Sequence, residues 1–439
     1  MLFKHEYNKN YDNETESYTN NNKSASLEMT DLLFDWNKIA KGAPPGLLGQ
    51  AFVFDETLRD GLQSPSVIEP SIEQKLSLIN QMDALGIVAC DLGMPGASTR
   101  QQEDIKRMLK HIRDNNLKIC PVIACRAVIS EIAWTVKVSQ EMDIPLEIYI
   151  VIASSPIRQF VENWSLTFIE NQSKDVIEYA VNNGLKCTYV SEDSTRATPE
   201  QLRRLFVTAI EAGASRLCLC DTVGDATPDG AESLTKFTLN LINELGRSVE
   251  VDWHGHNDRG LALANALAAG TAGATRLHGC AAGIGERCGN TSTDQLLINL
   301  KLSNHPFYGN RSLKDLSNYV QNATLACGYV LPINYPVIGR DAFRTSSGMH
   351  AAAIMKANVK GGRWLADRVY SSVSAEDVGR EQIIEVGPMS GLSNVNYWLN
   401  KHGLPKEFAE SLLKRVKQYT KVLEDSEIYK LIDELRDEI

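Results

Sequence analysis

Between residues 51 and 280, eight short apolar runs alternate with longer segments whose apolar residues recur at helical spacing. This alternation is typical of βα units, which assemble into a parallel sheet. Eight runs, each with room for a helix after it, fit a closed (β/α)8 barrel better than an open doubly wound sheet, which usually has fewer strands. We therefore expect an α/β protein with strands at 51–55, 87–93, 118–125, 146–153, 185–192, 216–221, 249–256 and 274–280.

The chain is longer than one barrel requires. A barrel of this type needs roughly 250 residues, and the chain has 439. We expect a TIM-barrel catalytic domain at 49–305, preceded at 1–48 by an Asn-rich tail and a lead-in helix. Helical accessory subdomains are expected at 306–365 and 366–439. Within the barrel, segment 71–86 begins with Ser and ends on Gly, as a helix should.

Composition excludes several classes of protein. The formal net charge of −10 argues against a general nucleic-acid surface, which needs clustered Lys and Arg. The chain has no run of eighteen apolar residues and its N-terminus lacks an apolar signal segment, so neither a membrane span nor secretion is expected. The nine cysteines are odd in number and their close pairs lack Cys-x-x-Cys spacing, which favours a reducing, cytoplasmic location.

Three polar segments fall at the expected C-terminal ends of strands, where barrel enzymes place their active sites. The first, DETLRDGLQ, contains Arg59 and Asp60, although an isolated Arg-Asp pair also fits a capped polar loop. The second is the His-Gly-His run at 254–256, in which residues i and i+2 of a strand point the same way. The third, GIGERCGN, ends at Asn290 and also fits a tight turn.

These segments supply a mixed set of oxygen and nitrogen donors. Such a set suits Zn²⁺, Mn²⁺, Co²⁺ or Mg²⁺. Coordination positions left open by the protein would accept substrate oxygens, as in catalytic rather than structural sites. We therefore expect a divalent-metal enzyme whose candidate site residues include Asp60, His254, His256 and Asn290.

Four ordered motifs, DETLRDGLQ, DTVGDATP, HGHNDRGLALANALAA and GIGERCGN, resemble those of the metal-dependent aldol acyltransferases and lyases. This family includes 2-isopropylmalate, homocitrate and citramalate synthases and hydroxymethylglutaryl-CoA lyase. The resemblance runs from about residue 54 to residue 300. It continues more weakly through SSGMHAAAIMK and VGPMSGLSNV, which are similar to the accessory region of 2-isopropylmalate synthases.

The resemblance implies a role for each motif residue. The protein metal ligands would be Asp60, His254 and His256, with Asn290 completing or supporting the shell. Arg59 would bind substrate and act in catalysis beside the reacting carbonyl.

Three further residues receive roles from the same resemblance. Thr222 would hydrogen-bond the carboxylate of an oxo acid, although a threonine there also fits a strand-end cap. Glu192 would line the pocket as a substrate-binding and catalytic residue, or it would contact another site residue without touching the substrate. His350 matches the family histidine assigned to acid-base work.

The chain departs from the family pattern at two positions. Thr345 stands where the family often has the first histidine of H-x-S-G-x-H, which puts a histidine pair in doubt but leaves His350 in place. Asp91 stands near the end of the second strand, where many relatives carry Glu. This change either alters the pocket or simply keeps a carboxylate.

The implied reaction is a Claisen-type condensation of acetyl-CoA with a 2-oxo acid. We expect 2-oxoisovalerate as the acceptor, as for 2-isopropylmalate synthases in leucine biosynthesis, because the strand-end segments 92–95, 124–126 and 152–155 are mostly apolar. The alternatives are pyruvate, 2-oxoglutarate, or a lyase that cleaves a 3-hydroxyacyl-CoA. A catalytically inactive binding barrel is a further alternative, which the joint presence of the metal and arginine residues disfavours.

The resemblance also implies a homodimer in which His350 is lent to the neighbouring barrel. The chain ends about where the regulatory domain of leucine-regulated relatives would begin. We therefore expect no leucine feedback.

Overall fold

The structure is a computed structural model that describes residues 32–33 and 48–437. The tail and lead-in helix expected over residues 1–48 lie outside the described residues, apart from 32–33 and 48. Among the helices that the structure describes, none is both long enough and apolar enough to cross a membrane.

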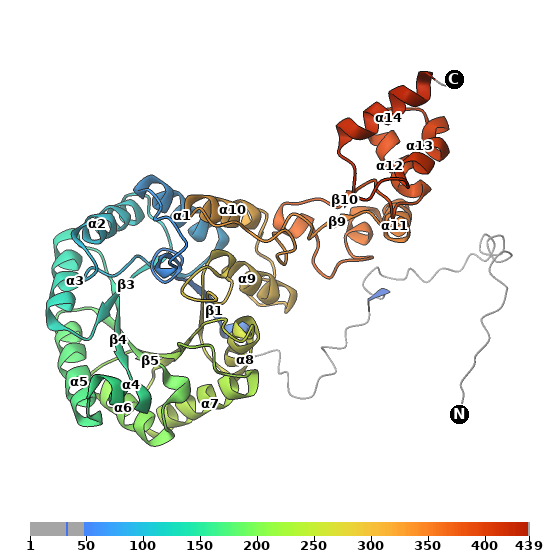
Figure 1. The fold of residues 1–439 in the computed structure, drawn as a ribbon. Helices are drawn as coiled ribbons and strands as arrows, with labels where there is room; N and C mark the ends of the chain where they lie inside the picture. Colours follow the sequence, from blue (N-terminus) through green and yellow to red (C-terminus); the bar gives the residue numbers. More distant parts are fainter. Residues whose placement is uncertain (1–31, 34–47, 438–439) are drawn as a thin grey trace, which may run out of the picture.

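Eight parallel strands form a closed barrel in chain order, and β8 closes it by pairing with β1 (Figure 1). This confirms the predicted (β/α)8 barrel. The expected strand ranges agree with the observed ones to within two residues at either end. The strands are β1 (Phe52–Asp55), β2 (Ala89–Asp91), β3 (Cys120–Arg126), β4 (Glu147–Ala153), β5 (Lys186–Glu192), β6 (Arg216–Asp221), β7 (Glu250–Gly255) and β8 (Arg276–Gly279).

Helices form an outer ring around the strands (Figure 1). Short 3₁₀ helices lie in the connections, among them η4 (Gly61–Gln63), η5 (Ser194–Arg196) and η6 (Ala281–Gly283). The ring consists of α1 (Ile72–Leu85), α2 (Thr99–Asp114), α3 (Ile129–Met142), α5 (Leu166–Asn182), α6 (Pro199–Glu211), α7 (Pro228–Glu244), α8 (Ala262–Ala272) and α9 (Thr293–Leu302). The short helix α4 (Pro156–Glu162) lies in the connection between β4 and α5.

Helix α1 begins and ends where its sequence predicts. The hydroxyl of Ser71 accepts a hydrogen bond from the backbone N–H of Gln74, and the Gln74 side chain accepts one from the backbone N–H of Ser71. This capping box satisfies two N–H groups that the helix leaves unpaired. Gly86 ends the helix with φ 81°, a left-handed conformation that glycine adopts without steric cost. The helix predicted over 71–86 is therefore confirmed.

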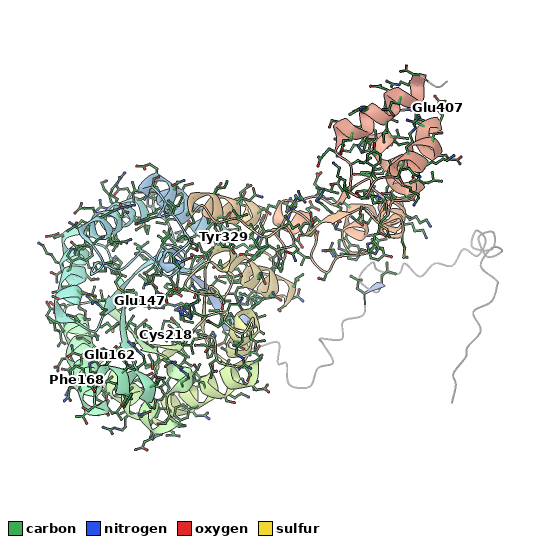
Figure 2. All side chains as sticks on the ribbon, viewed as in Figure 1. Glu147, Glu162, Phe168, Cys218, Tyr329 and Glu407 are labelled. Atoms are coloured by element: carbon green, nitrogen blue, oxygen red, sulfur yellow. The ribbon has the colours of Figure 1, made fainter. Side chains whose placement is uncertain are left out.

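The barrel interior carries a layer of paired charges near the N-terminal ends of the strands. Arg276 of β8 donates through Nη2 to both carboxylate oxygens of Glu147 of β4, at 2.8 and 2.7 Å. Arg216 of β6 donates to Oδ1 of Asp252 of β7 at 2.6 Å. Figure 2 labels Glu147 inside the ring of helices. Each buried charge has an opposite partner, without which its burial would be strongly destabilising.

The chain leaves the barrel through α10 (Leu316–Ala326), which packs against α1. The C-terminal helices then pack around a second apolar core that includes Trp398, Leu412 and Ile432. They lie to one side of the barrel in Figure 1. The division at 305/306 and 365/366 stays a prediction. The remaining elements are β9 (Arg344–Thr345), α11 (Gly348–Ala366), η7 (Glu376–Val378), β10 (Ile383–Ile384), α12 (Leu392–Lys401), η8 (Lys406–Phe408), α13 (Ala409–Val416) and α14 (Asp425–Asp437).

Asp294, in the first turn of α9, ties this helix to the loop after β8. Its Oδ1 accepts a hydrogen bond from the backbone N–H of Ala282 at 2.9 Å, and its side chain is buried. Burial raises the pKa of the Asp294 carboxyl from 3.8 to about 6. Because the folded-state pKa lies above the unfolded value, the stability contributed by protonated Asp294 is present at low pH. It is lost as the pH rises through about 6.

Replacing Asp294 with asparagine should therefore favour the folded state more at pH 7.5 than at pH 4.5. We take the unfolding free energy of the variant minus that of the wild type at each pH. This value should be about 2 kcal/mol higher at pH 7.5 than at pH 4.5. Urea unfolding of both proteins at each pH measures it. Comparing the two pH values cancels any constant cost of the substitution. An equal effect at both would contradict the raised pKa.

Candidate metal and active site

The candidate ligands converge at the C-terminal mouth of the barrel. Asp60 follows β1 and immediately precedes η4, and His254 lies on β7 with His256 just beyond the strand. Asn290 comes from the loop that connects β8 to α9. All four side chains are buried. Strand ends that are distant in sequence become neighbours here because the barrel closes between β8 and β1.

Asp60, His254 and His256 offer ligand atoms that all lie within 4.8 Å of one another. The two histidine Nε2 atoms are 3.3 Å apart, and His254 Nε2 is 3.7 Å from Asp60 Oδ2. Asn290 joins this cluster by donating through Nδ2 to Asp60 Oδ1 at 3.0 Å. The structure thus brings together the four residues that the sequence suggested.

The chemistry of this cluster fits a divalent cation. Burial and the neighbouring His254 lower the pKa of His256 to about 4, so its imidazole is neutral and keeps a lone pair at neutral pH. Burial opposes ionisation of Asp60, but Arg59 and His254 hold the pKa of its carboxyl below the usual value. Asn290 Oδ1 is buried and has no hydrogen-bond partner among the described residues. An anionic oxygen and two imidazoles form a mixed set suited to such metals, and Asn290 supports this set through its hydrogen bond to Asp60.

Arg59 is held beside the cluster by three carboxylates. Its Nε donates to Asp91 Oδ2 at 2.7 Å, its Nη1 donates to Asp60 Oδ2 at 2.8 Å, and its Nη2 donates to Glu56. Burial raises the pKa of Asp91 to about 6, although Arg59 counteracts part of this effect. Asp91 thus keeps a carboxylate at the end of β2, and that carboxylate positions Arg59.

Thr222 and Glu192 line the same pocket, which has a volume of about 220 Å³. Thr222 Oγ1 accepts a hydrogen bond from the backbone N–H of Asp193 at 2.8 Å, which leaves its own hydroxyl hydrogen free to donate. Burial raises the pKa of Glu192, and Arg158 of α4, 3.3 Å away, partly offsets the rise.

Polar and ionisable side chains make up more than half of the pocket lining, and two of the three predicted segments contribute to its apolar part. Met94 and Ala124 come from segments 92–95 and 124–126. From β4 the wall takes Tyr149 and Val151 instead of residues 152–155. Val190, Cys218 and Cys220 complete the apolar part.

His350 is not brought to the cluster within one chain. It lies near the start of α11, which Figure 1 places with the C-terminal helices, outside the barrel. Its ring stacks on that of Tyr370 with the centroids 4.0 Å apart. A role for His350 in this pocket therefore requires a second chain or a different position of the C-terminal helices.

The sequence did not single out Glu56 and His278, which also line this pocket. Glu56 directly follows β1, and His278 lies on β8. Both are buried, and Glu56 Oε2 lies 2.6 Å from His254 Nδ1. The sequence did contain one signal, because His278 is an ionisable residue near the C-terminal end of an expected strand. A single histidine in a strand, however, also fits a core position.

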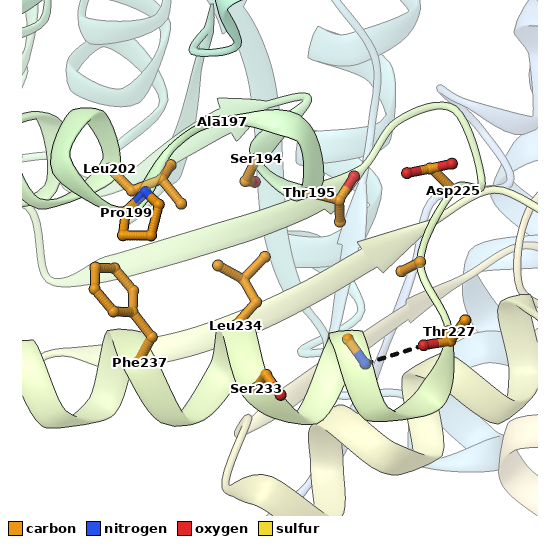
Figure 3. A pocket seen from close by; sticks show the side chains of 12 residues that line it. Ser194, Thr195, Ala197, Pro199, Leu202, Asp225, Thr227, Ser233, Leu234 and Phe237 are labelled. Carbon is orange, nitrogen blue, oxygen red and sulfur yellow. Dashed lines mark hydrogen bonds between the residues drawn. The ribbon is translucent and has the colours of Figure 1, made fainter.

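A larger cavity of about 510 Å³ lies between α6, η5 and the start of α7 (Figure 3). Asp225 is the only ionisable side chain among the described residues that line it, and Leu202, Leu234 and Phe237 form much of its wall. This cavity lacks a group of potential metal ligands. The smaller pocket at the barrel mouth is therefore the candidate active site.

Residues 50–320 match the model of a protein family described as HMGL-like. A homocitrate synthase of Pyrococcus horikoshii is 32% identical over 83% of this chain and 94% of its own length. A 2-isopropylmalate synthase of Lactococcus lactis subsp. cremoris is 30% identical over 86% of this chain and 72% of its own length.

A solved structure shows the same fold at lower identity. The hydroxymethylglutaryl-CoA lyase of Pseudomonas aeruginosa is 18% identical, with a TM-score of 0.52, over 63% of this chain and 92% of its own. This similarity concerns the barrel architecture only.

Proposed function

Because this chain belongs to the HMGL-like family, we propose that it is a metal-dependent acyltransferase that condenses acetyl-CoA with a small 2-oxo acid. Relatives named 2-isopropylmalate synthase and homocitrate synthase are similar over most of the chain. Among the acceptors, we propose 2-oxoisovalerate; the carbon–carbon bond forms between its ketone carbon and the acetyl methyl, and water then hydrolyses the condensed thioester to give 2-isopropylmalate and CoA. The observation that carries this proposal is the cluster of Asp60, His254 and His256 beside Arg59 at the barrel mouth.

The reaction needs a polarised ketone and an acetyl methyl that can lose a proton. A divalent cation held by Asp60 and the two histidines would supply Lewis-acid chemistry at the ketone oxygen. Arg59 adds a fixed positive charge at the same place, because three carboxylates hold its guanidinium in one orientation. The hydroxyl of Thr222, already oriented by Asp193, would donate to the carboxylate of the oxo acid.

Glu192 and His350 are the proposed proton-handling residues. A carboxyl whose pKa is raised by burial, like that of Glu192, can carry a proton closer to neutral pH than an exposed one. His350 would accept the proton of the acetyl methyl after being placed over the barrel mouth of a second chain. We therefore propose a homodimer with shared active sites.

Two exposed apolar surfaces support this dimer. One lies on α4 next to the barrel mouth and includes Phe160 and Val161, which are 83% and 62% exposed. The other lies beside His350 and includes Met349 and Met389, which are 72% and 73% exposed. Contact between these surfaces of two chains would remove apolar area from water, which favours association.

The pocket wall favours a short aliphatic acceptor with a single carboxylate. Met94, Ala124 and Val151 offer apolar contacts. Two further arginines near the pocket are already paired, Arg158 with Glu192 and Glu162 at 3.3 Å and Arg287 with Asp258 at 2.9 Å. A second substrate carboxylate, as in 2-oxoglutarate, would meet no unpaired cation among the residues that line this pocket.

Acceptor choice tests this proposal directly. Free CoA released from acetyl-CoA is measured with a thiol reagent in the presence of Mn²⁺, Mg²⁺ or Zn²⁺, with each of the three 2-oxo acids. We expect kcat/KM for 2-oxoisovalerate to exceed that for pyruvate by roughly 10-fold or more, since each methylene in an apolar pocket contributes about 1–3 kcal/mol. Chelation of the metal should abolish the signal. Preference for another acid would retain the mechanism and change the substrate, whereas no release with any acid would contradict the synthase proposal.

A further inference from the structure

Glu56 connects three residues at the floor of the candidate active site. Its side chain is 1% exposed. One carboxylate oxygen, Oε1, accepts a hydrogen bond from Nη2 of Arg59. The other, Oε2, lies 2.6 Å from Nδ1 of His254 and 3.4 Å from Nδ1 of His278. One carboxylate therefore contacts both a candidate metal ligand and the arginine beside it.

The contact with Glu56 determines which nitrogen of His254 is free. An ionised carboxylate only accepts hydrogen bonds, so the proton of this contact is on Nδ1 of His254. In the neutral imidazole the lone pair is then on Nε2. That atom faces His256 Nε2 at 3.3 Å and Asp60 Oδ2 at 3.7 Å. Glu56 thereby presents the lone pair of His254 to the centre of the cluster.

Glu56 is in turn held from the barrel interior. His278 lies between Glu56 and Asp252, and its Nε2 is 3.2 Å from Asp252 Oδ2. Asp252 also accepts a hydrogen bond from Arg216 at 2.6 Å. Through His278, Glu56 is therefore adjacent to the buried charged layer of the barrel.

We propose that Glu56 is a positioning residue that fixes the tautomer and orientation of His254 for metal binding and simultaneously orients Arg59. This inference rests on the metal site of the proposed function and extends the role of Glu56 from its contact with Arg59 to the tautomer of His254. Carboxylates that accept the second N–H of a ligand histidine commonly raise metal affinity 10- to 100-fold. Glu56 differs from such a partner in holding Arg59 with its other oxygen.

A second metal site is the competing interpretation, since Glu56, His254 and His278 also offer ligand atoms within 4.8 Å of one another. The geometry disfavours it. Tetrahedral ligands at about 2.0–2.1 Å from Zn²⁺ lie roughly 3.3 Å apart. Glu56 Oε2 and His254 Nδ1 are only 2.6 Å apart, which is a hydrogen-bonding distance.

Isothermal titration of Mn²⁺ into the metal-free full-length protein tests this role without substrate. Glu56→Gln should weaken Mn²⁺ binding by about 10- to 100-fold. Glu170→Gln is the matched control, because Glu170 pairs with Arg204 on the outer helices and is remote from the cluster. It should bind Mn²⁺ as the wild type does. Glu56→Asp keeps the charge but shortens the side chain, so it should fold and still bind Mn²⁺ more weakly.

The tautomer of His254 provides a second measurement, because a purely structural role of Glu56 would leave this tautomer unchanged. In ¹⁵N-histidine spectra of the metal-free protein, His254 should carry its proton on Nδ1, and Glu56→Gln should reduce the population of this form. Wild-type Mn²⁺ affinity in both Glu56 variants, or weaker binding with an unchanged His254 tautomer, would overturn the inference. Failure of the wild type to bind any divalent cation would instead contradict the metal site of the proposed function.

Discussion

Replacing Asp60 with alanine is expected to abolish both divalent-cation binding and turnover. Asp60 is the only carboxylate in the group it forms with His254 and His256, so its loss leaves two neutral ligands and removes the anionic charge that attracts a cation. It also removes an acceptor for Arg59 and for Asn290. Since Lewis-acid stabilisation contributes several kcal/mol, turnover should fall by roughly 10³-fold or more.

Metal-dependent stabilisation measures this effect separately from activity. A cation at 100 times its Kd should stabilise the wild type by about 2.7 kcal/mol, seen as a higher Tm, and should leave Asp60→Ala unchanged. Asp114→Ala is a suitable control, because Asp114 lies at the exposed end of α2 and pairs with Lys110 and Arg113. Retention of the metal-induced shift in Asp60→Ala would show that these residues do not hold the cation.

Replacing His350 with alanine is expected to reduce turnover by about 10²- to 10⁴-fold while leaving metal affinity intact. This range is typical for removal of a general base. Metal affinity should persist because His350 lies on α11, away from the barrel cluster of its own chain. Titration of Mn²⁺ and steady-state kinetics on the same preparation measure both effects.

Mixing the two inactive variants tests whether His350 acts in a neighbouring chain. In a dimer that exchanges subunits, half of the re-formed dimers pair Asp60→Ala with His350→Ala. Each of these dimers has one site with an intact barrel and a donated His350. Activity should therefore recover to roughly one quarter of the wild type in an equal mixture. Absence of recovery, with exchange demonstrated by differently tagged chains, would contradict a shared site.

The barrel and the convergence of the candidate metal ligands were predictable because both follow from regular patterns in the sequence. Eight apolar runs define eight strands, and parallel strands in a barrel bring their C-terminal ends to one mouth. Asp60 and Asn290 meet there although they are 230 residues apart. The His-Gly-His run places two imidazoles on one side because side chains alternate along a strand. No knowledge of individual contacts was needed for these predictions.

The contacts of Glu56 were not predictable in the same way. They depend on the register with which β8 pairs with β1, where Phe54 lies opposite His278, and on the reach of individual side chains. No short-range pattern carries this information. The expected contribution of segment 152–155 was wrong in detail for a simpler reason. Tyr149 and Val151 of β4 point into the barrel, so the alternation along the strand turns Ile152 towards the helices.

The buried layer of Arg216, Arg276, Glu147 and Asp252 limits how this protein can be engineered. Removing one partner of a buried ion pair typically costs about 3–5 kcal/mol, so single substitutions that deepen the floor beneath the pocket should cost a large part of the stability of the fold. The side wall has no such constraint, because Ala124, Val151 and Val190 contribute only apolar contacts. Variants selected to accept longer 2-oxo acids should therefore accumulate changes in this wall and leave the charged floor untouched.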